Sequence, residues 1–184
     1  MNNQQTIFSR LHSERYLNLA KQYYLAAKKM PYAFPVTGTL VHHAFEFMFK
    51  AILISREPIN DHAEAKFFKN SLRKYGKSGH GLFDLSQDVN KLLGVKLINF
   101  ENLVKEIDRW EILRYLKTGE INGMITDKRD ESADFVSNDP FGYLLVWSEA
   151  DKLFQILLND LGSLNITSLP GDKIISELST LLEI

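Results

Sequence analysis

The segment that decides the fold is residues 36–55, VTGTLVHHAFEFMFKAILIS. On a helical wheel at about 100° per residue, apolar side chains cover most of its circumference. A helix of this kind is buried, so we expect it at the centre of a helical bundle. Its polar side chains gather within an arc of about 100°. We call this arc the polar seam, and it consists of Thr39, His42, His43, Glu46 and Lys50.

The polar seam admits three interpretations. Because a buried charge destabilises a fold unless it is paired, the seam predicts polar partners. Glu46 and Lys50 are spaced i, i+4 in the favourable order, and the simplest interpretation is an internal ion pair that fixes helix register. The alternatives are a groove that binds a ligand and a metal site. His42 and Glu46 could share a metal, but the sequence offers no HExxH and no third ligand, so we predict neither a metal nor a cofactor.

Helical periodicity extends along most of the chain, with apolar residues recurring at intervals of three and four. No run alternates as a strand does, and residues 119–138 predict an irregular loop. Asn99 and Asp139 are good N-caps for the helices that follow them. The sequence therefore predicts a single all-α domain over residues 1–184, a bundle of five to seven helices. Besides 36–55, the expected helices cover about 7–30, 62–75, 80–93, 100–118, 140–161 and 172–183.

The composition excludes several classes of protein. The 184 residues are 45% hydrophobic and 24% charged, as in an ordinary globular domain. The chain has no cysteine, which excludes a disulfide scaffold, and it has no apolar stretch long enough to span a membrane. The N-terminus lacks the apolar run of a signal peptide. We therefore expect a cytoplasmic protein without a membrane partner.

Charge is unevenly distributed along the chain. Residues 1–118 hold 18 basic and 11 acidic residues, whereas residues 119–184 hold 4 basic and 12 acidic residues. Such asymmetry indicates a polyanionic partner for the first part or self-association of unlike faces. Chance clustering on solvated helix faces is the alternative.

A basic segment, KFFKNSLRKYGKSGH, occupies residues 66–80. It holds no acid, and aromatic residues are interleaved with its cations. Cations bind phosphates and exposed aromatic rings stack on bases, so the segment predicts a nucleic-acid-binding surface. The alternative is a helix that buries its phenylalanines and leaves its lysines in water. The predicted phosphate-binding residues are Lys66, Lys69, Lys74 and Lys77.

Arg73 and His80, within this segment, form a candidate catalytic pair. Histidine can act as acid or base on an RNA 2′-hydroxyl while arginine binds the phosphate. The alternative is that His80 caps the following helix and Arg73 is a solvated charge. Arg10 and Arg15 flank His12 in a similar pattern, but their spacing fits less well. The chain contains no GxSxG, GxGxxG or Walker A motif.

Three short motifs in the chain resemble the HEPN superfamily, the higher eukaryotes and prokaryotes nucleotide-binding helical domains. The first is the spacing of Glu46 and Lys50 in HAFEFMFKAILI. The second is the step Gly79-His80-Gly81-Leu82, where a glycine replaces the acid usual in the family. The third is Arg114-Tyr115, near the end of a later helix, where both side chains could reach the polar seam. The resemblance covers roughly residues 12–160 and implies a long central antiparallel helix pair and a homodimer.

The resemblance also carries expectations about function. HEPN members include RNA-cleaving toxins, inactive relatives, and accessory domains that bind nucleotides or partner proteins. Cleaving members build one metal-free site from two subunits around an Arg, four to six residues and a His, and Arg73 and His80 match this spacing. Because Gly76 and Gly79 interrupt the interval, we expect a non-catalytic or weakly catalytic module that binds nucleic acid or nucleotide, in a defence or toxin–antitoxin setting. The alternatives are a metal-independent endoribonuclease that uses Arg73 and His80, and a protein-interaction domain.

Overall fold

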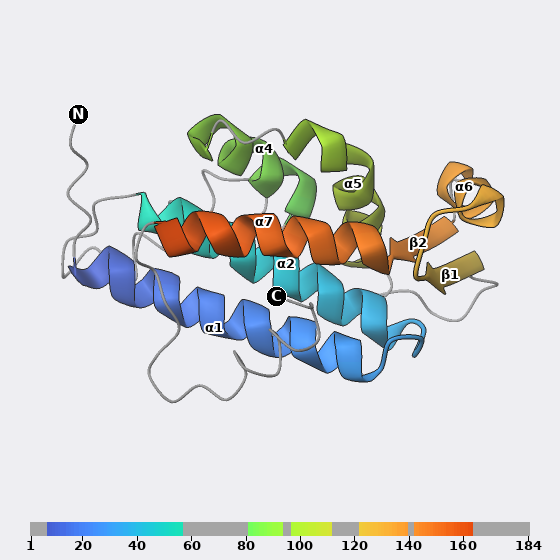
Figure 1. Ribbon diagram of the computed structural model, residues 1–184, viewed down its shortest axis with the longest axis horizontal. Coiled ribbons are helices and arrows are strands. Elements are labelled where there is room, and N and C mark those ends of the chain that lie inside the picture. The colour runs from blue at the N-terminus through green and yellow to red at the C-terminus, as the bar shows by residue number, and fades with distance from the viewer. Residues whose placement is uncertain (1–6, 57–80, 94–96, 112–121, 140–141, 164–184) are drawn as a thin grey trace.

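The computed structural model describes residues 7–56, 81–93, 97–111, 122–139 and 142–163. Within these ranges six α-helices pack together, accompanied by a short 3₁₀ helix, η1, and a two-stranded sheet (Figure 1). The predicted all-α bundle of five to seven helices is therefore confirmed. The helices are α1 (Ile7–Lys29), α2 (Val36–Ser55), α4 (Leu82–Leu93), α5 (Glu101–Arg109), α6 (Glu131–Asn138) and α7 (Trp147–Ser163), with η1 at Leu97–Phe100.

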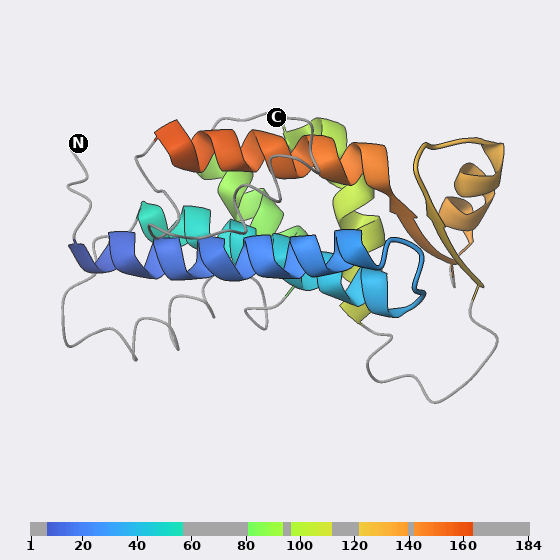
Figure 2. The ribbon, with the colours of Figure 1, turned by 60° about the horizontal axis from the view of Figure 1, so that its bottom comes forward.

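Helices α1 and α2 form a long antiparallel pair, as the resemblance implied. They lie side by side along their length in both ribbon views (Figures 1 and 2), and Ser13 Oγ on α1 donates to the Ala51 carbonyl on α2 at 2.7 Å. Helix α2 also contacts α4, α5 and α7. Most of its residues are buried, because its apolar side chains cover most of its circumference. Its expected central position is confirmed.

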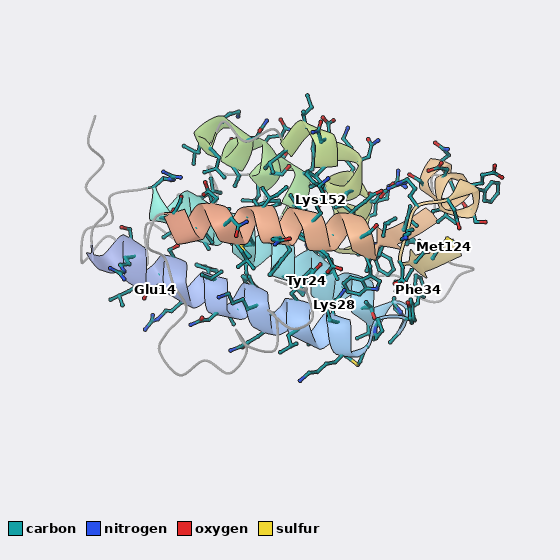
Figure 3. All side chains as sticks on the ribbon, in the orientation of Figure 1. Glu14, Tyr24, Lys28, Phe34, Met124 and Lys152 are labelled. Atoms are coloured by element: carbon teal, nitrogen blue, oxygen red, sulfur yellow. The ribbon has the colours of Figure 1, made fainter. Side chains whose placement is uncertain are left out.

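Helix α7 is fixed to α1 through a shared carboxylate. The Tyr24 hydroxyl donates to Asp151 Oδ1 at 2.8 Å, and Lys28 Nζ lies 2.8 Å from Asp151 Oδ2 and 4.4 Å from the centre of the Trp147 ring. Figure 3 shows Tyr24 and Lys28 on the side of α1 that faces α7. Burial, followed by the nearby Asp151 charge, raises the pKa of Tyr24 well above its ordinary value. The phenol therefore stays neutral and donates its proton to the carboxylate.

Helix α2 and the end of α5 approach closely at a glycine. A Cβ added to Gly38 would lie 1.8 Å from Cε3 of Trp110, so only glycine admits the indole ring at this point. Trp110 follows α5, and its Nε1 donates to the buried carbonyl of Leu144 at 3.1 Å. One side chain thus joins the central helix to the sheet, which also positions Glu111, the next residue, beside α2.

The sheet corrects two expectations. Strands β1 (Asn122–Thr126) and β2 (Gly142–Val146) pair in parallel, with Ile125 opposite Leu145, and α6 connects them. The predicted irregular loop at 119–138 therefore contains a strand and a helix, and the helix predicted from residue 140 begins at Trp147. Every residue of β2 is buried. A strand buried on both faces is a continuous apolar run without alternation, which the sequence alone does not distinguish from a helical turn.

The predicted helix caps are also corrected. Asp139 caps the C-terminus of α6 instead of opening a helix, and the N-cap of α6 is Asp130, whose side chain accepts from Ala133 N at 2.9 Å. Asn99 lies within η1, and Phe100 is the N-cap of α5. The helices predicted at 62–75 and 172–183, and the end of the one predicted at 100–118, lie outside the described residues. No helix in the described ranges is both long and apolar enough to cross a membrane.

Candidate functional site

The polar seam of α2 contains a buried ion pair. Glu46 and Lys50 are each about 3% exposed, and Lys50 Nζ donates to Glu46 Oε1. The other oxygen, Glu46 Oε2, lies 3.2 Å from Nδ1 of His43. The internal Glu–Lys pair predicted from their spacing is therefore present, and an imidazole extends it by one turn.

His42 meets a residue that the sequence did not single out. Its side chain is fully buried, its Nδ1 lies 3.3 Å from the Ile107 carbonyl, and its Nε2 lies 3.2 Å from Oε2 of Glu111. One ring nitrogen of His42, one of His43 and a carboxylate oxygen of Glu111 all lie within 4.8 Å of one another. This group of possible metal ligands in the described residues differs from the His42–Glu46 pair considered from the sequence, because His43 and Glu111 take the place of Glu46.

An open cavity lies beside the seam, between α1 and α2. Its volume is about 350 Å³ and Tyr16 and Phe47 contribute two of its walls, with ring centroids 5.8 Å apart and planes inclined by 34°. We call this cavity the α1–α2 groove. Its lining residues are His12, Arg15, Tyr16, Leu19 and Phe47.

Side chains of the α1–α2 groove lie against side chains of the polar seam. Phe47 stacks on His43, with ring centroids 6.2 Å apart, and Lys50 Nζ lies 6.0 Å from the Phe47 centroid. Burial raises the pKa of Tyr16, and the charge of Glu46 raises it further. The electrostatics of the seam therefore extend into the groove, which combines a neutral phenol, a phenyl ring and the exposed guanidinium of Arg15.

A second ionic cluster lies between α5, α6 and α7. Arg129 donates to Glu106 at 2.9 Å and to Glu149 at 2.8 Å, and Ser137 Oγ donates to Glu106 at 2.5 Å. We call these four residues the Arg129 cluster. Hydrogen bonds to Glu149 and Glu106 raise the pKa of Arg129, against the opposing effect of burial. The cluster fixes the β1–α6 connection to the bundle.

Several predicted site residues lie outside the described part of the chain. They include the candidate catalytic pair, the four candidate phosphate-binding lysines, and the two residues expected to reach the seam: Arg73, His80, Lys66, Lys69, Lys74, Lys77, Arg114 and Tyr115. Their predicted roles stay predictions. The groove residues His12 and Arg15 carried a weak signal in sequence, as part of the Arg–His pattern near the start of α1. Glu111 carried none.

The fold and the seam define a helical bundle with a parallel βαβ unit and a buried polar centre on α2. Comparisons with protein-family models, with curated proteins and with solved structures give no match to this chain. The chemistry of the groove and of the seam therefore carries the functional conclusion.

Proposed function

We propose that this chain is a non-catalytic or weakly catalytic helical module that binds nucleic acid or nucleotide in the α1–α2 groove. The observation that carries the proposal is the groove lining, in which two aromatic rings stand next to an exposed guanidinium. A base stacks on aromatic rings whatever its identity, and arginine binds phosphate through its planar donors. The volume of about 350 Å³ is near the lower end for small-ligand pockets.

The charges of α1 support this assignment. Its 23 residues include five Lys or Arg residues and a single acid, Glu14. Arg10 pairs with Glu14 at 3.0 Å, and Lys28 pairs with Asp151 at 2.8 Å. Arg15 makes no ion pair with any residue in the described ranges, so its charge is available to an anion without breaking an internal contact. The positive balance of residues 1–118 adds an attractive field for a polyanion.

The HEPN resemblance supports the same function and supplies its setting. On that resemblance we propose a homodimer that acts in defence or in a toxin–antitoxin pair, and on the sequence composition we propose that it is cytoplasmic. The basic segment 66–80 would extend the phosphate-binding surface beyond the groove, through Lys66, Lys69, Lys74 and Lys77.

The proposal is tested by fluorescence anisotropy of a labelled single-stranded RNA at several salt concentrations. We expect affinity to fall steeply with salt, because each phosphate contact releases counterions. Arg15→Gln should weaken binding and lower the salt slope by about one. Phe47→Leu should weaken binding by roughly 1–3 kcal/mol through lost stacking, with the salt slope unchanged. Lys91→Gln, which removes an exposed cation on α4, is the matched control and should leave binding unchanged.

Two outcomes contradict the proposal. One is binding that does not respond to salt, and the other is equal affinity in Arg15→Gln and Lys91→Gln. The same reactions, run with chelator, also report cleavage. RNA cleavage that disappears in His80→Ala would favour the metal-independent endoribonuclease with Arg73 and His80.

A protein-interaction domain is the second candidate function, and one surface favours it. The turn between α1 and α2 exposes apolar side chains, including Tyr32 at 59% and Val36 at 49%. Phe34, from the same turn, packs against Gly123 of β1, and Figure 3 shows its side chain near the labelled Met124 of the same strand. Exposed apolar patches mark interaction sites. If RNA binding is absent, a partner captured by the wild type and lost in Tyr32→Ser would support this candidate.

A further inference from the structure

We propose that His42, His43 and Glu111 form a binding site for a divalent cation of the zinc class, which fastens α2 to the end of α5. This inference does not depend on the proposed nucleic-acid function. It depends on the three ligand atoms that lie within 4.8 Å of one another and on the hydrogen bonds that orient the two imidazoles.

The contacts of His42 favour a cation beside its Nε2. A backbone carbonyl only accepts hydrogen bonds, so the contact of Nδ1 with the Ile107 carbonyl at 3.3 Å places the ring proton on Nδ1. In a neutral ring the Nε2 lone pair then points toward Oε2 of Glu111, 3.2 Å away. Two acceptors at this distance repel each other. A divalent cation bound by both atoms, or a proton held between them, removes this repulsion.

His43 also donates a hydrogen bond from Nδ1, in this case to a carboxylate. Its Nδ1 lies 3.2 Å from Glu46 Oε2 and donates to it, so in the neutral ring the lone pair is on Nε2. Glu46 is itself held by Lys50. Metal-binding histidines usually donate their other ring proton to a carboxylate or a backbone carbonyl, which fixes the tautomer. In this protein His42 donates to a backbone carbonyl and His43 donates to a carboxylate.

The ligand set indicates the chemical class of the ion. Two imidazoles and one carboxylate suit zinc and related first-row ions, whereas magnesium and calcium prefer oxygen ligands throughout. Ligand atoms about 2.1 Å from a tetrahedral ion are about 3.4 Å apart. The 3.2 Å between His42 Nε2 and Glu111 Oε2 is close to this spacing, and the ligand atom of His43, within 4.8 Å of them, would move inward. The side chains of His43 and Glu111 are 17% and 24% exposed, which gives an ion a route from solvent.

Cobalt(II) titration of the full chain, prepared without a histidine tag and treated with chelator, tests the site. Wild type should bind one equivalent per chain with the visible absorption of tetrahedral cobalt, and zinc should displace it. His43→Gln and Glu111→Gln should each weaken binding by at least about 100-fold, since even supporting residues around a metal site contribute about 10–100-fold. His12→Gln, which removes a histidine from the groove and not from the site, is the matched control.

Circular dichroism of each variant establishes that it is folded. Absence of the visible bands in wild type overturns the proposal whatever the variants do, and the His42–Glu111 contact is then held by a proton and not by a metal. Cobalt affinity that is equal in wild type and Glu111→Gln also overturns it. RNA binding by Glu111→Gln separates this proposal from the nucleic-acid function, because loss of the metal should leave the contacts of Arg15 and Phe47 in place.

Discussion

The polar seam and the Arg129 cluster both bury charged side chains, but they use them differently. In the Arg129 cluster, one guanidinium meets two carboxylates from α5 and α7, at 2.9 and 2.8 Å. In the seam, Glu46 is paired with Lys50 within α2 and also contacts His43. The seam further adjoins an open groove and a second carboxylate, Glu111.

This difference is the basis on which we propose a structural role for the Arg129 cluster and a binding role for the groove beside the seam. The Arg129 cluster joins three segments of the chain, and each of its side chains is engaged by another element of the fold. The seam lies beside the α1–α2 groove, an open cavity of about 350 Å³, and contacts it through Phe47, which lines the groove and stacks on His43. Buried charge that only joins helices is readily replaced by apolar packing, whereas charge beside a cavity also acts on any ligand that binds there.

Breaking the seam should have the largest effect on stability. Glu46→Ala leaves the ammonium of Lys50 buried at 3% exposure without its partner. We expect a loss of about 3–5 kcal/mol in the free energy of unfolding, measured by urea denaturation. The double variant Glu46→Ala with Lys50→Met should recover much of the loss, because it removes both charges. A loss under about 0.5 kcal/mol in the single variant would mean that the seam is solvated.

Breaking the Arg129 cluster should have a smaller effect. Arg129→Met leaves Glu106 buried with Ser137 as its remaining side-chain partner in the described ranges. The Arg129 side chain is 27% exposed and that of Glu149 is 31% exposed, so water screens part of the change. We expect a loss of about 2 kcal/mol in the same urea experiment.

Two comparisons between variants test the expected stability loss in Arg129→Met. Arg129→Met with Glu106→Gln should be more stable than Arg129→Met alone, and RNA binding should be unchanged in both variants. A loss in Arg129→Met larger than that in Glu46→Ala would reverse the ranking of the two regions. Loss of RNA binding in a folded Arg129→Met variant would give the cluster a functional role.

The contrast also explains how much the sequence predicted. The position of α2 followed from its apolar circumference, and the Glu46–Lys50 pair followed from a spacing of four, because both are properties of one helix. Strand β2 could not be distinguished from a helix, since a five-residue run buried on both faces has no period. Arg129 lies in a charged stretch, DKRDE, typical of a solvated loop.

Partners from distant segments were not predictable by spacing. Glu111 meets His42 because the indole of Trp110 packs against Gly38 and fixes the end of α5 beside α2. Tyr16 has the period of a core residue, yet it forms a wall of the groove. Such contacts depend on the angles and positions at which the helices cross. In a single sequence these are determined only by steric details, such as the glycine at position 38 that faces Trp110.

The smallest expected effect is a shift in the titration of Tyr16. Burial, and then the charge of Glu46, raises the pKa of its phenol above the ordinary value near 10. Glu46→Gln removes the second cause, so the pKa of Tyr16 should fall part of the way back. Ultraviolet titration compares each protein with the same protein carrying Tyr16→Phe, which isolates this phenol among the 7 tyrosines.

The raised pKa of Tyr16 also determines how the stability of the fold changes with pH. A group whose pKa is raised on folding contributes stability that is present below its unfolded pKa and is lost as pH rises through the folded value. The stability contributed by Tyr16 should therefore be lost above about pH 10. The loss should extend to a higher pH in wild type than in Glu46→Gln. Glu106→Gln, in the other cluster, should leave the Tyr16 titration where it is. An equal shift in both variants would mean that the charge of the seam does not act specifically on the groove, and the electrostatic distinction between the two regions would fail.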